Sequence, residues 1–318
     1  MAILRPVPRT RIPDAVLSLA HDRAAARGAQ DWAAADRIRA EIEAAGWKIV
    51  DRGTDFALEP AHPPSVADGD VILYGSSESV PSRLTEAATG AATVVLVATD
   101  WPADLERGIA ALRAYAPAGT TIVVVADGPS DGQATALSAA DGLEVVRTSE
   151  RLGAGAAWNI GIRRASGSVV VILDGSVEPT GDVITPLVAA LDDPTVGVAG
   201  GYGIVSADLR SFEDGAAGDV TAIEGYAIAF RRDEAAARGP IDERFRFYRN
   251  LDIWWSLVLR DEGEGSPPRR AVALPIPAIR HAHRGWTSLP EAERDRLSKR
   301  NFYRIIDRFG WRRDLATG

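Results

Sequence analysis

Two stretches of the chain decide its fold: residues 121–132, TIVVVADGPSDG, and residues 151–179, RLGAGAAWNIGIRRASGSVVVILDGSVEP. In each stretch an apolar, β-branched run ends at an aspartate that is followed by glycine. Short apolar runs bounded by turn residues predict strands that are buried on both faces. The residues between Arg151 and Ser166 have the composition of a helix, so the second stretch reads as helix, strand and turn.

The same alternation extends outward from these two stretches. Further β-rich runs lie at 93–98 and 143–148, and helical stretches lie at 103–116, 131–140 and 155–165. Alternating strands and helices predict a doubly wound, mostly parallel sheet with right-handed crossovers. Such sheets bind ligands at the carboxyl ends of their strands. We therefore expect Asp127 and Asp174 to end neighbouring strands at one edge of the sheet.

The ends of the chain have a different character. Residues 1–65 predict a module with a helical hairpin, followed by a weakly alternating hairpin over 47–59. Residues 66–90 follow a turn-rich segment and are interpreted as a linker, and residues 91–318 form the main domain. The last helix, over about 288–315, is amphipathic, so we expect it to dock on the main domain or on a second copy of the chain.

Composition removes several classes of protein. The chain has 318 residues, 46% apolar and 25% charged, which is typical of a globular protein. Cysteine is absent, which excludes disulfides and thiol catalysis. The net charge of −8 argues against a general affinity for nucleic acid or anionic membrane. We find no export signal and no membrane-spanning segment, and expect a cytoplasmic protein.

Residues 93–310 resemble a family 2 glycosyltransferase of the GT-A fold. VVVADGPSDG is similar to that family's strand followed by Asp-Asp-Gly-Ser-x-Asp. RLGAGAAWNIGIRRASGSVVVILDGSVEP is similar to its Asn-x-Gly and Asp-x-Asp segment, and IEGYAIAFRRDEAAARGPIDERFRFYRNLDIWWSLVLRDEG to its acceptor and base segment. The resemblance implies an inverting enzyme that transfers a sugar from a nucleotide sugar, UDP- or dTDP-linked, to an acceptor that the sequence does not reveal.

The resemblance also implies a donor site. Thr99 and Asp127 would contact the nucleobase, and Arg151 would lie near the base or the diphosphate. The remaining donor-site residues match the family's Asn-x-Gly and Asp-x-Asp motifs: Asn159, Asp174, Gly175 and Ser176. A divalent cation, Mg²⁺ or Mn²⁺, would be held by Asp174 and His283, because hard cations prefer oxygen ligands and histidine is a common further ligand.

Two departures from the family pattern affect the chemistry. Ser176 stands where the second aspartate of Asp-x-Asp is expected, which weakens metal binding; Glu178 or an arginine could compensate. The family's Glu-Asp base pair aligns with Arg249-Asn250, and an asparagine is not a base. Asp252 is the nearest carboxylate and is our candidate for the catalytic base, although a residue there also complements a helix dipole. The rival interpretation is a non-catalytic relative that binds a nucleotide sugar or a protein partner.

The N-terminal module has a resemblance of its own. Its pattern, from Ala26-Arg27 through Asp31-Trp32 and ADRIR at 35–39 to Ile49-Val50-Asp51, is similar to the C-terminal helical module of cysteinyl-tRNA synthetases. That module helps to hold tRNA in its own family. Here the local charge is mixed and the synthetase's catalytic domain is absent, so we favour a role in packing or assembly.

Overall fold

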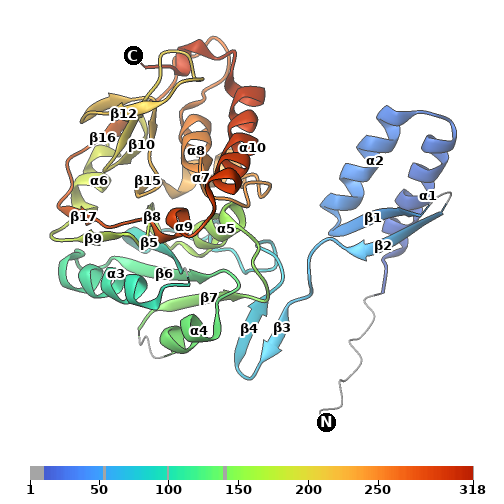
Figure 1. Ribbon diagram of the computed structural model, residues 1–318, viewed down its shortest axis with the longest axis horizontal. Helices are drawn as coiled ribbons and strands as arrows, with labels where there is room; N and C mark the ends of the chain where they lie inside the picture. The colour runs from blue at the N-terminus through green and yellow to red at the C-terminus, as the bar shows by residue number, and fades with distance from the viewer. Residues whose placement is uncertain (1–10, 53–54, 99, 139–141, 318) are drawn as a thin grey trace. The chain divides into compact units, whose positions relative to one another are not determined.

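The computed structural model describes residues 11–52, 55–98, 100–138 and 142–317. Contacts divide the chain into two compact units, Met1–Pro64 and Ser65–Gly318. Figure 1 shows both, and each is described by itself. Predicted Thr99 lies outside the described residues.

The first unit contains a helical hairpin and a β-hairpin, both as predicted. Its elements are α1 (Asp14–Gly28), α2 (Trp32–Ala44), β1 (Trp47–Arg52) and β2 (Asp55–Pro60). The side chain of Asp31 accepts a hydrogen bond from the Ala34 N–H and caps α2. Arg23 is 3% exposed and pairs with Asp51 at 2.8 Å, which ties α1 to the end of β1.

The second unit is built on one large sheet. Among the described residues ten strands join in the order β13-β16-β10-β15-β8-β5-β6-β7-β4-β3. Its parallel centre is close to the predicted strands: β5 (Gly90–Ala98), β6 (Thr121–Ala126), β7 (Glu144–Thr148) and β8 (Gly167–Leu173). The other members of the sheet are β3 (Val66–Asp68), β4 (Val71–Tyr74), β10 (Val196–Gly200), β13 (Gly218–Val220), β15 (Ala227–Arg231) and β16 (Arg270–Ala273).

Helices cover both faces of this sheet, as Figure 1 shows. Alternate residues of β5 separate the two cores: Val94 and Leu96 belong to one, Val95 to the other. The first core includes side chains of α3 (Pro102–Tyr115) and α6 (Ile184–Ala190). The second includes side chains of α5 (Ala154–Arg164), α8 (Leu251–Arg260) and α10 (Glu291–Phe309). The apolar runs that predicted strands are thus buried on both sides.

Smaller elements complete the unit. They are α4 (Asp131–Ser138), α7 (Arg232–Arg238), α9 (Arg284–Thr287), a 3₁₀ turn (Arg313–Leu315), and the short strands β9 (Val177–Pro179), β11 (Gly203–Val205), β12 (Glu213–Gly215), β14 (Ala222–Ile223) and β17 (Ala278–Arg280). Strand β9 pairs with β17, and β11 lies between β12 and β14.

Two expectations from the sequence are corrected. Residues 66–74 are not a linker: β3 and β4 form a hairpin, and β4 pairs in parallel with β7, so this segment extends the large sheet. Strands β6 and β8, which precede Asp127 and Asp174, are not neighbours either, because β5 lies between them. In a doubly wound sheet the chain adds strands first to one side and then to the other side of its first strand. Both aspartates still follow parallel strands at the same edge.

The C-terminal helix α10 packs on the main domain, one of its two predicted docking places. Its buried residues Asn301, Ile305 and Phe309 recur at helical spacing, and the last two join the core that contains α8. In the described part of the chain, every helix is too short or too polar to cross a bilayer.

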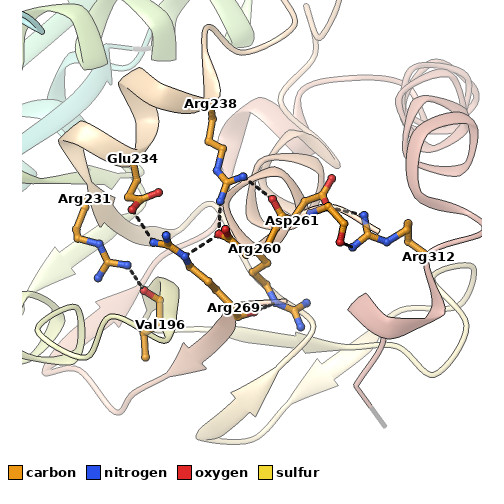
Figure 2. A network of polar contacts seen from close by, with 10 residues as sticks. Val196, Arg231, Glu234, Arg238, Arg260, Asp261, Arg269 and Arg312 are labelled. Atoms are coloured by element: carbon orange, nitrogen blue, oxygen red, sulfur yellow. Dashed lines mark hydrogen bonds and ion pairs between the residues drawn. The ribbon is translucent and has the colours of Figure 1, made fainter. Parts of the chain in front are cut away.

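A network of arginines fixes the carboxyl end of α8 (Figure 2). Arg269 pairs with Glu234 of α7 and with Glu262, each at 2.7 Å, and its carbonyl accepts a hydrogen bond from Arg260 at 2.8 Å. Arg312, which lies in the C-terminal segment, pairs with Asp261 at the end of α8. The network thus anchors the end of α8 opposite to its first turn, which carries Asp252.

Candidate functional site

The site is built from residues at the carboxyl edge of the parallel strands. Asp174 follows β8, and Asp252 lies in the first turn of α8. A short run between β14 and β15 connects them, because the Asp174 N–H donates to the Tyr226 carbonyl at 2.9 Å and the Gly225 N–H donates to Asp252 Oδ2 at 2.7 Å. The two residues are 78 positions apart in the sequence, yet neighbouring residues of this run bind the backbone of Asp174 and the carboxylate of Asp252.

His283 forms the partner of Asp174. Its Nε2 lies 3.3 Å from Asp174 Oδ2, while Ser176 donates to the other oxygen, Oδ1, through its N–H at 2.8 Å and its hydroxyl at 2.5 Å. Burial alone would raise the pKa of Asp174, but the hydrogen bonds from His283 and Ser176 outweigh it, so that pKa lies below its usual range. The resemblance implied that Asp174 and His283 share a site, and in the structure the two side chains are in contact.

The tautomer of His283 follows from its second contact. His283 Nδ1 accepts a hydrogen bond from the Trp286 N–H at 3.2 Å and so caps α9. A neutral ring with its proton on Nε2 satisfies both this contact and Asp174. Burial lowers the pKa of His283 and Asp174 outweighs that effect, so the pKa is raised. Protonation of His283 at Nδ1 would still require the loss of the hydrogen bond from the Trp286 N–H.

Aromatic rings surround this pair. Tyr248 stacks on the His283 ring with centroids 4.4 Å apart, and Tyr226 meets the same ring edge-on at 6.1 Å. A nearby histidine, His281, has a different partner: its Nε2 lies 2.7 Å from Glu178 Oε2, and Glu178 is also 3.5 Å from Arg107. The carboxylate of Glu178 is therefore already paired with His281 and Arg107.

A second carboxylate, Glu224, lies beside Asp252. Burial and the negative charge of Asp252 both raise the pKa of Glu224, and Arg280 pairs with it at 3.3 Å. Burial also raises the pKa of Asp252, although the N–H groups of Gly225 and Ile253 donate to it. Sequence reasoning missed Glu224. Its only signal was an acidic residue directly before glycine in the segment IEGY.

The predicted nucleobase residues form a second group at the same edge. Both Asp127 oxygens accept backbone hydrogen bonds, from the Leu152 N–H at 2.6 Å and the Gly153 N–H at 2.8 Å. Burial raises the pKa of Asp127 in spite of these donors. Arg151 pairs with Asp100 at 2.6 Å. The carboxylate of Asp127 thus organises the turn before α5, and base contact by Asp127 and Arg151 stays a prediction.

Gly128 shows how closely these turns approach. Its φ is +57°, and a Cβ at this position would lie 2.4 Å from the Arg151 nitrogen. Trp101, which follows β5, borders the His283 turn, since a Cβ on Gly285 would lie 3.9 Å from the Trp101 ring. The segments after β5, β6 and β8 therefore meet along one edge.

Two other predicted residues have different surroundings. The Asn159 side chain is buried in α5, where it donates to the Ile241 carbonyl and to Glu243 Oε1, both at 2.9 Å, and accepts from the Ile241 N–H. Its polar atoms are all used within the protein, so it holds the segment after α7. Gly175 borders open space, because a Cβ there would meet no atom within 4 Å. A binding role for either stays a prediction.

Comparisons with known proteins agree with this architecture. Residues 93–236 match the family model described as glycosyl transferase family 2. The structure of GalNAc-T7 with UDP, GalNAc and Mn²⁺ is similar with a TM-score of 0.53 and 17% identity, over 68% of this chain and 47% of that chain. The fold is GT-A. The predicted fold class is thus confirmed for the main domain.

Other relatives are more distant or shorter. The mannosyltransferase PcManGT from Pyrobaculum calidifontis, in complex with GDP-Man and Mn²⁺, has a TM-score of 0.48 and 18% identity, over 74% of this chain and 75% of that chain. A cysteine–tRNA ligase of Opitutus terrae is 48% identical over 54 residues, 17% of this chain and 12% of the ligase. The chain thus spans less than half of GalNAc-T7 and about an eighth of the ligase it matches.

The predicted cation site would need enough free ligand atoms around Asp174 and His283. Among the described residues, no group of three or more histidine, aspartate or glutamate side chains could hold a metal ion. Asp174 and His283 supply two groups, but the bare nitrogen of a neutral His283 is Nδ1, which already accepts the Trp286 N–H. As placed, these residues do not fit a cation held by the protein alone.

Proposed function

We propose that the protein is a glycosyltransferase that moves a sugar from a nucleotide-sugar donor to a hydroxyl acceptor with inversion. One observation carries the proposal: the neighbouring residues Tyr226 and Gly225 bind the Asp174 backbone and the Asp252 carboxylate at the edge of the GT-A sheet where its parallel strands end. The match over residues 93–236 supports the reaction class, and the similar structure of GalNAc-T7, which contains UDP and GalNAc, supports the donor class. UDP- and dTDP-linked sugars are the donors that the sequence favours.

The reaction needs a base on the acceptor side. The acceptor oxygen attacks the anomeric carbon, the bond from that carbon to the diphosphate oxygen breaks, and the hydroxyl proton passes to a carboxylate. Asp252 is our candidate for this role. A raised pKa makes its carboxylate a stronger base than an ordinary aspartate, which favours proton removal near neutral pH.

The donor side needs hydrogen-bond donors for a diphosphate that gains negative charge. The His283 Nε2–H faces Asp174 at 3.3 Å, so in this proposal the diphosphate shares or replaces Asp174 as the acceptor of that hydrogen bond. Tyr248 stacks on the face of the His283 ring and Tyr226 meets the ring edge-on, so both limit its movement. These residues bind and orient the leaving group in this proposal, while Asp252 receives the proton.

The experiment is a donor-hydrolysis and binding assay. The purified chain is incubated with UDP-, dTDP- and GDP-linked sugars, with and without Mn²⁺ or Mg²⁺, and release of the nucleoside diphosphate is measured. We expect slow release from one donor class, because water replaces the missing acceptor. Absence of both binding and hydrolysis with every donor would refute the proposal.

A second candidate function is binding without catalysis. The observation that favours it is that both oxygens of Asp252 already accept N–H bonds from the chain, at 2.7 and 2.9 Å. A carboxylate used in this way can be purely structural. Calorimetry separates the two functions: a non-catalytic protein binds an intact nucleotide sugar and returns it unhydrolysed, also when a panel of hydroxyl acceptors is present.

A further inference from the structure

Within the described ranges of the chain, no arginine or lysine forms an ion pair with Asp174, whose charged partner is His283. Asp174 Oδ1 accepts two hydrogen bonds from Ser176, and Oδ2 faces His283. His283 gains a second proton only by losing its contact with the Trp286 N–H. A leaving diphosphate has a charge that a single neutral donor stabilises poorly, so another cation is needed.

Arg249 is a cation next to this pair. Its guanidinium lies over the Trp286 ring, 5.6 Å from the centroid, and the Trp286 N–H is bonded to His283. The preceding residue, Tyr248, stacks on the His283 ring. The Arg249 side chain is exposed, and within the described segments no carboxylate lies within ion-pair distance of it. A charge that is stacked on an aromatic face and lacks an anionic partner is available for a ligand.

Helix α10 holds the turn that carries Arg249. Buried Asn301 donates to the carbonyls of Phe247 and Arg249, at 2.7 and 2.9 Å. Asn250 has a φ of +69°, in the left-handed region, and donates to the Ser298 carbonyl at 3.0 Å. Three side-chain hydrogen bonds with one helix thus specify a backbone conformation that a non-glycine residue rarely adopts. Arg249 therefore projects from a fixed turn and not from a free loop.

The effect of the Arg249 charge on neighbouring titratable groups agrees with a position beside the site. Burial leaves the pKa values of Glu224 and Asp252 raised, but the charge of Arg249 opposes that shift, and it also works against protonation of His283. The same guanidinium thus acts on groups of both the donor and the acceptor side. It is the residue that stands where the sequence pattern led us to expect a carboxylate.

We propose that the Arg249 guanidinium, stacked on Trp286 beside the Asp174–His283 pair, binds the diphosphate of the nucleotide donor. It supplies positive charge in place of a metal ion, because Ser176 and His283 do not form a metal site. The inference rests on the proposed function, because it presupposes a nucleotide diphosphate as ligand. Guanidinium suits this ligand, since its planar fork donates two parallel hydrogen bonds to phosphate oxygens.

The test compares nucleotides that differ only in their phosphates. Binding of uridine, UMP and UDP to the full chain is measured by calorimetry in EDTA, with dTDP and GDP as further diphosphates. We expect wild type to bind UDP without metal. Arg249→Gln should weaken UDP binding about ten- to hundredfold, the loss typical of a charge-assisted contact, and leave uridine binding unchanged. Arg249→Lys should retain part of the affinity, because it keeps the charge but not the fork.

Arg296→Gln is the matched control. Arg296 is an exposed residue of α10 that pairs with Glu293, so its removal changes the net charge equally. We expect its UDP affinity to equal that of wild type, and thermal unfolding of each variant checks the fold. If Arg249→Gln binds UDP as tightly as wild type in EDTA, the inference is wrong while the proposed function stands. If wild type binds none of these nucleotides, with or without Mn²⁺, the proposed function fails and the inference fails with it.

Discussion

Replacement of Asp252 by asparagine tests the proposed base most directly. In the structure, Asp252 Oδ2 accepts the Gly225 N–H at 2.7 Å and Oδ1 accepts the Ile253 N–H at 2.9 Å. Asparagine has only one oxygen, so its NH₂ group must face one of these two N–H donors. One hydrogen bond is lost and one donor is left without a partner, which costs about 1–3 kcal/mol of folding free energy.

The effect on turnover should exceed the effect on stability. A positioned general base contributes about 10²–10⁴-fold to rate, and an amide cannot accept the acceptor's proton. We expect Asp252→Asn to lower kcat by about 10²–10⁴-fold and to leave the affinity for the donor nucleotide nearly unchanged. The assay is transfer to an identified hydroxyl acceptor, together with calorimetry of the nucleotide and thermal unfolding of both proteins.

Glu224→Gln is the matched control, because Glu224 is the neighbouring carboxylate and its pKa is raised for the same reason. We expect a smaller loss of kcat from this variant. Near-wild-type turnover in Asp252→Asn, or a larger loss in Glu224→Gln, would refute the assignment of the base. The base must be deprotonated to act, and burial raises the pKa of Asp252. In a plot of kcat against pH, we therefore expect activity to fall on the acid side at a pH above the usual aspartate pKa.

Three further predictions concern binding and stability. Asp127→Ala should weaken nucleotide binding by about 1–3 kcal/mol, by loss of hydrogen bonds or of the turn they organise, and calorimetry with UDP measures it; an unchanged affinity would contradict its place in the donor site. Mn²⁺ should bind the free protein weakly and more tightly when UDP is present, because the diphosphate supplies the missing oxygens; tight binding without nucleotide would contradict this. Arg23→Gln should speed amide exchange in α1 and β1 at neutral pH. Because Arg23 lowers the pKa of Asp51, the stability from this pair is full above the unfolded pKa of about 3.9 and disappears as pH falls through the lowered folded value. Equal exchange in both proteins at pH 7 would show that the pair contributes nothing.

Much of the site could be located from the sequence, because strand ends are easy to recognise. Asp127 and Asp174 each follow an apolar run, and parallel strands bring their carboxyl ends to one edge. The pairing of Asp174 with His283 followed from the resemblance and not from local pattern, since 109 positions separate the two residues. Glu224 could not be predicted in this way. Its proximity to Asp252 depends on how the run before β15 packs against α8.

The sequence by itself determined the order of strands and helices in the main domain, the helical hairpin before it, and the edge of the sheet at which the candidate site lies. Apolar periodicity and turn residues act over a few positions, so they can be read from the chain directly. Only the tertiary structure decided that residues 66–74 join the large sheet, that the His283 tautomer disfavours a metal, and that Arg249 is held beside the site. Those outcomes depend on contacts between segments far apart in the sequence, where the energy lies in packing and hydrogen bonding and no local pattern records it.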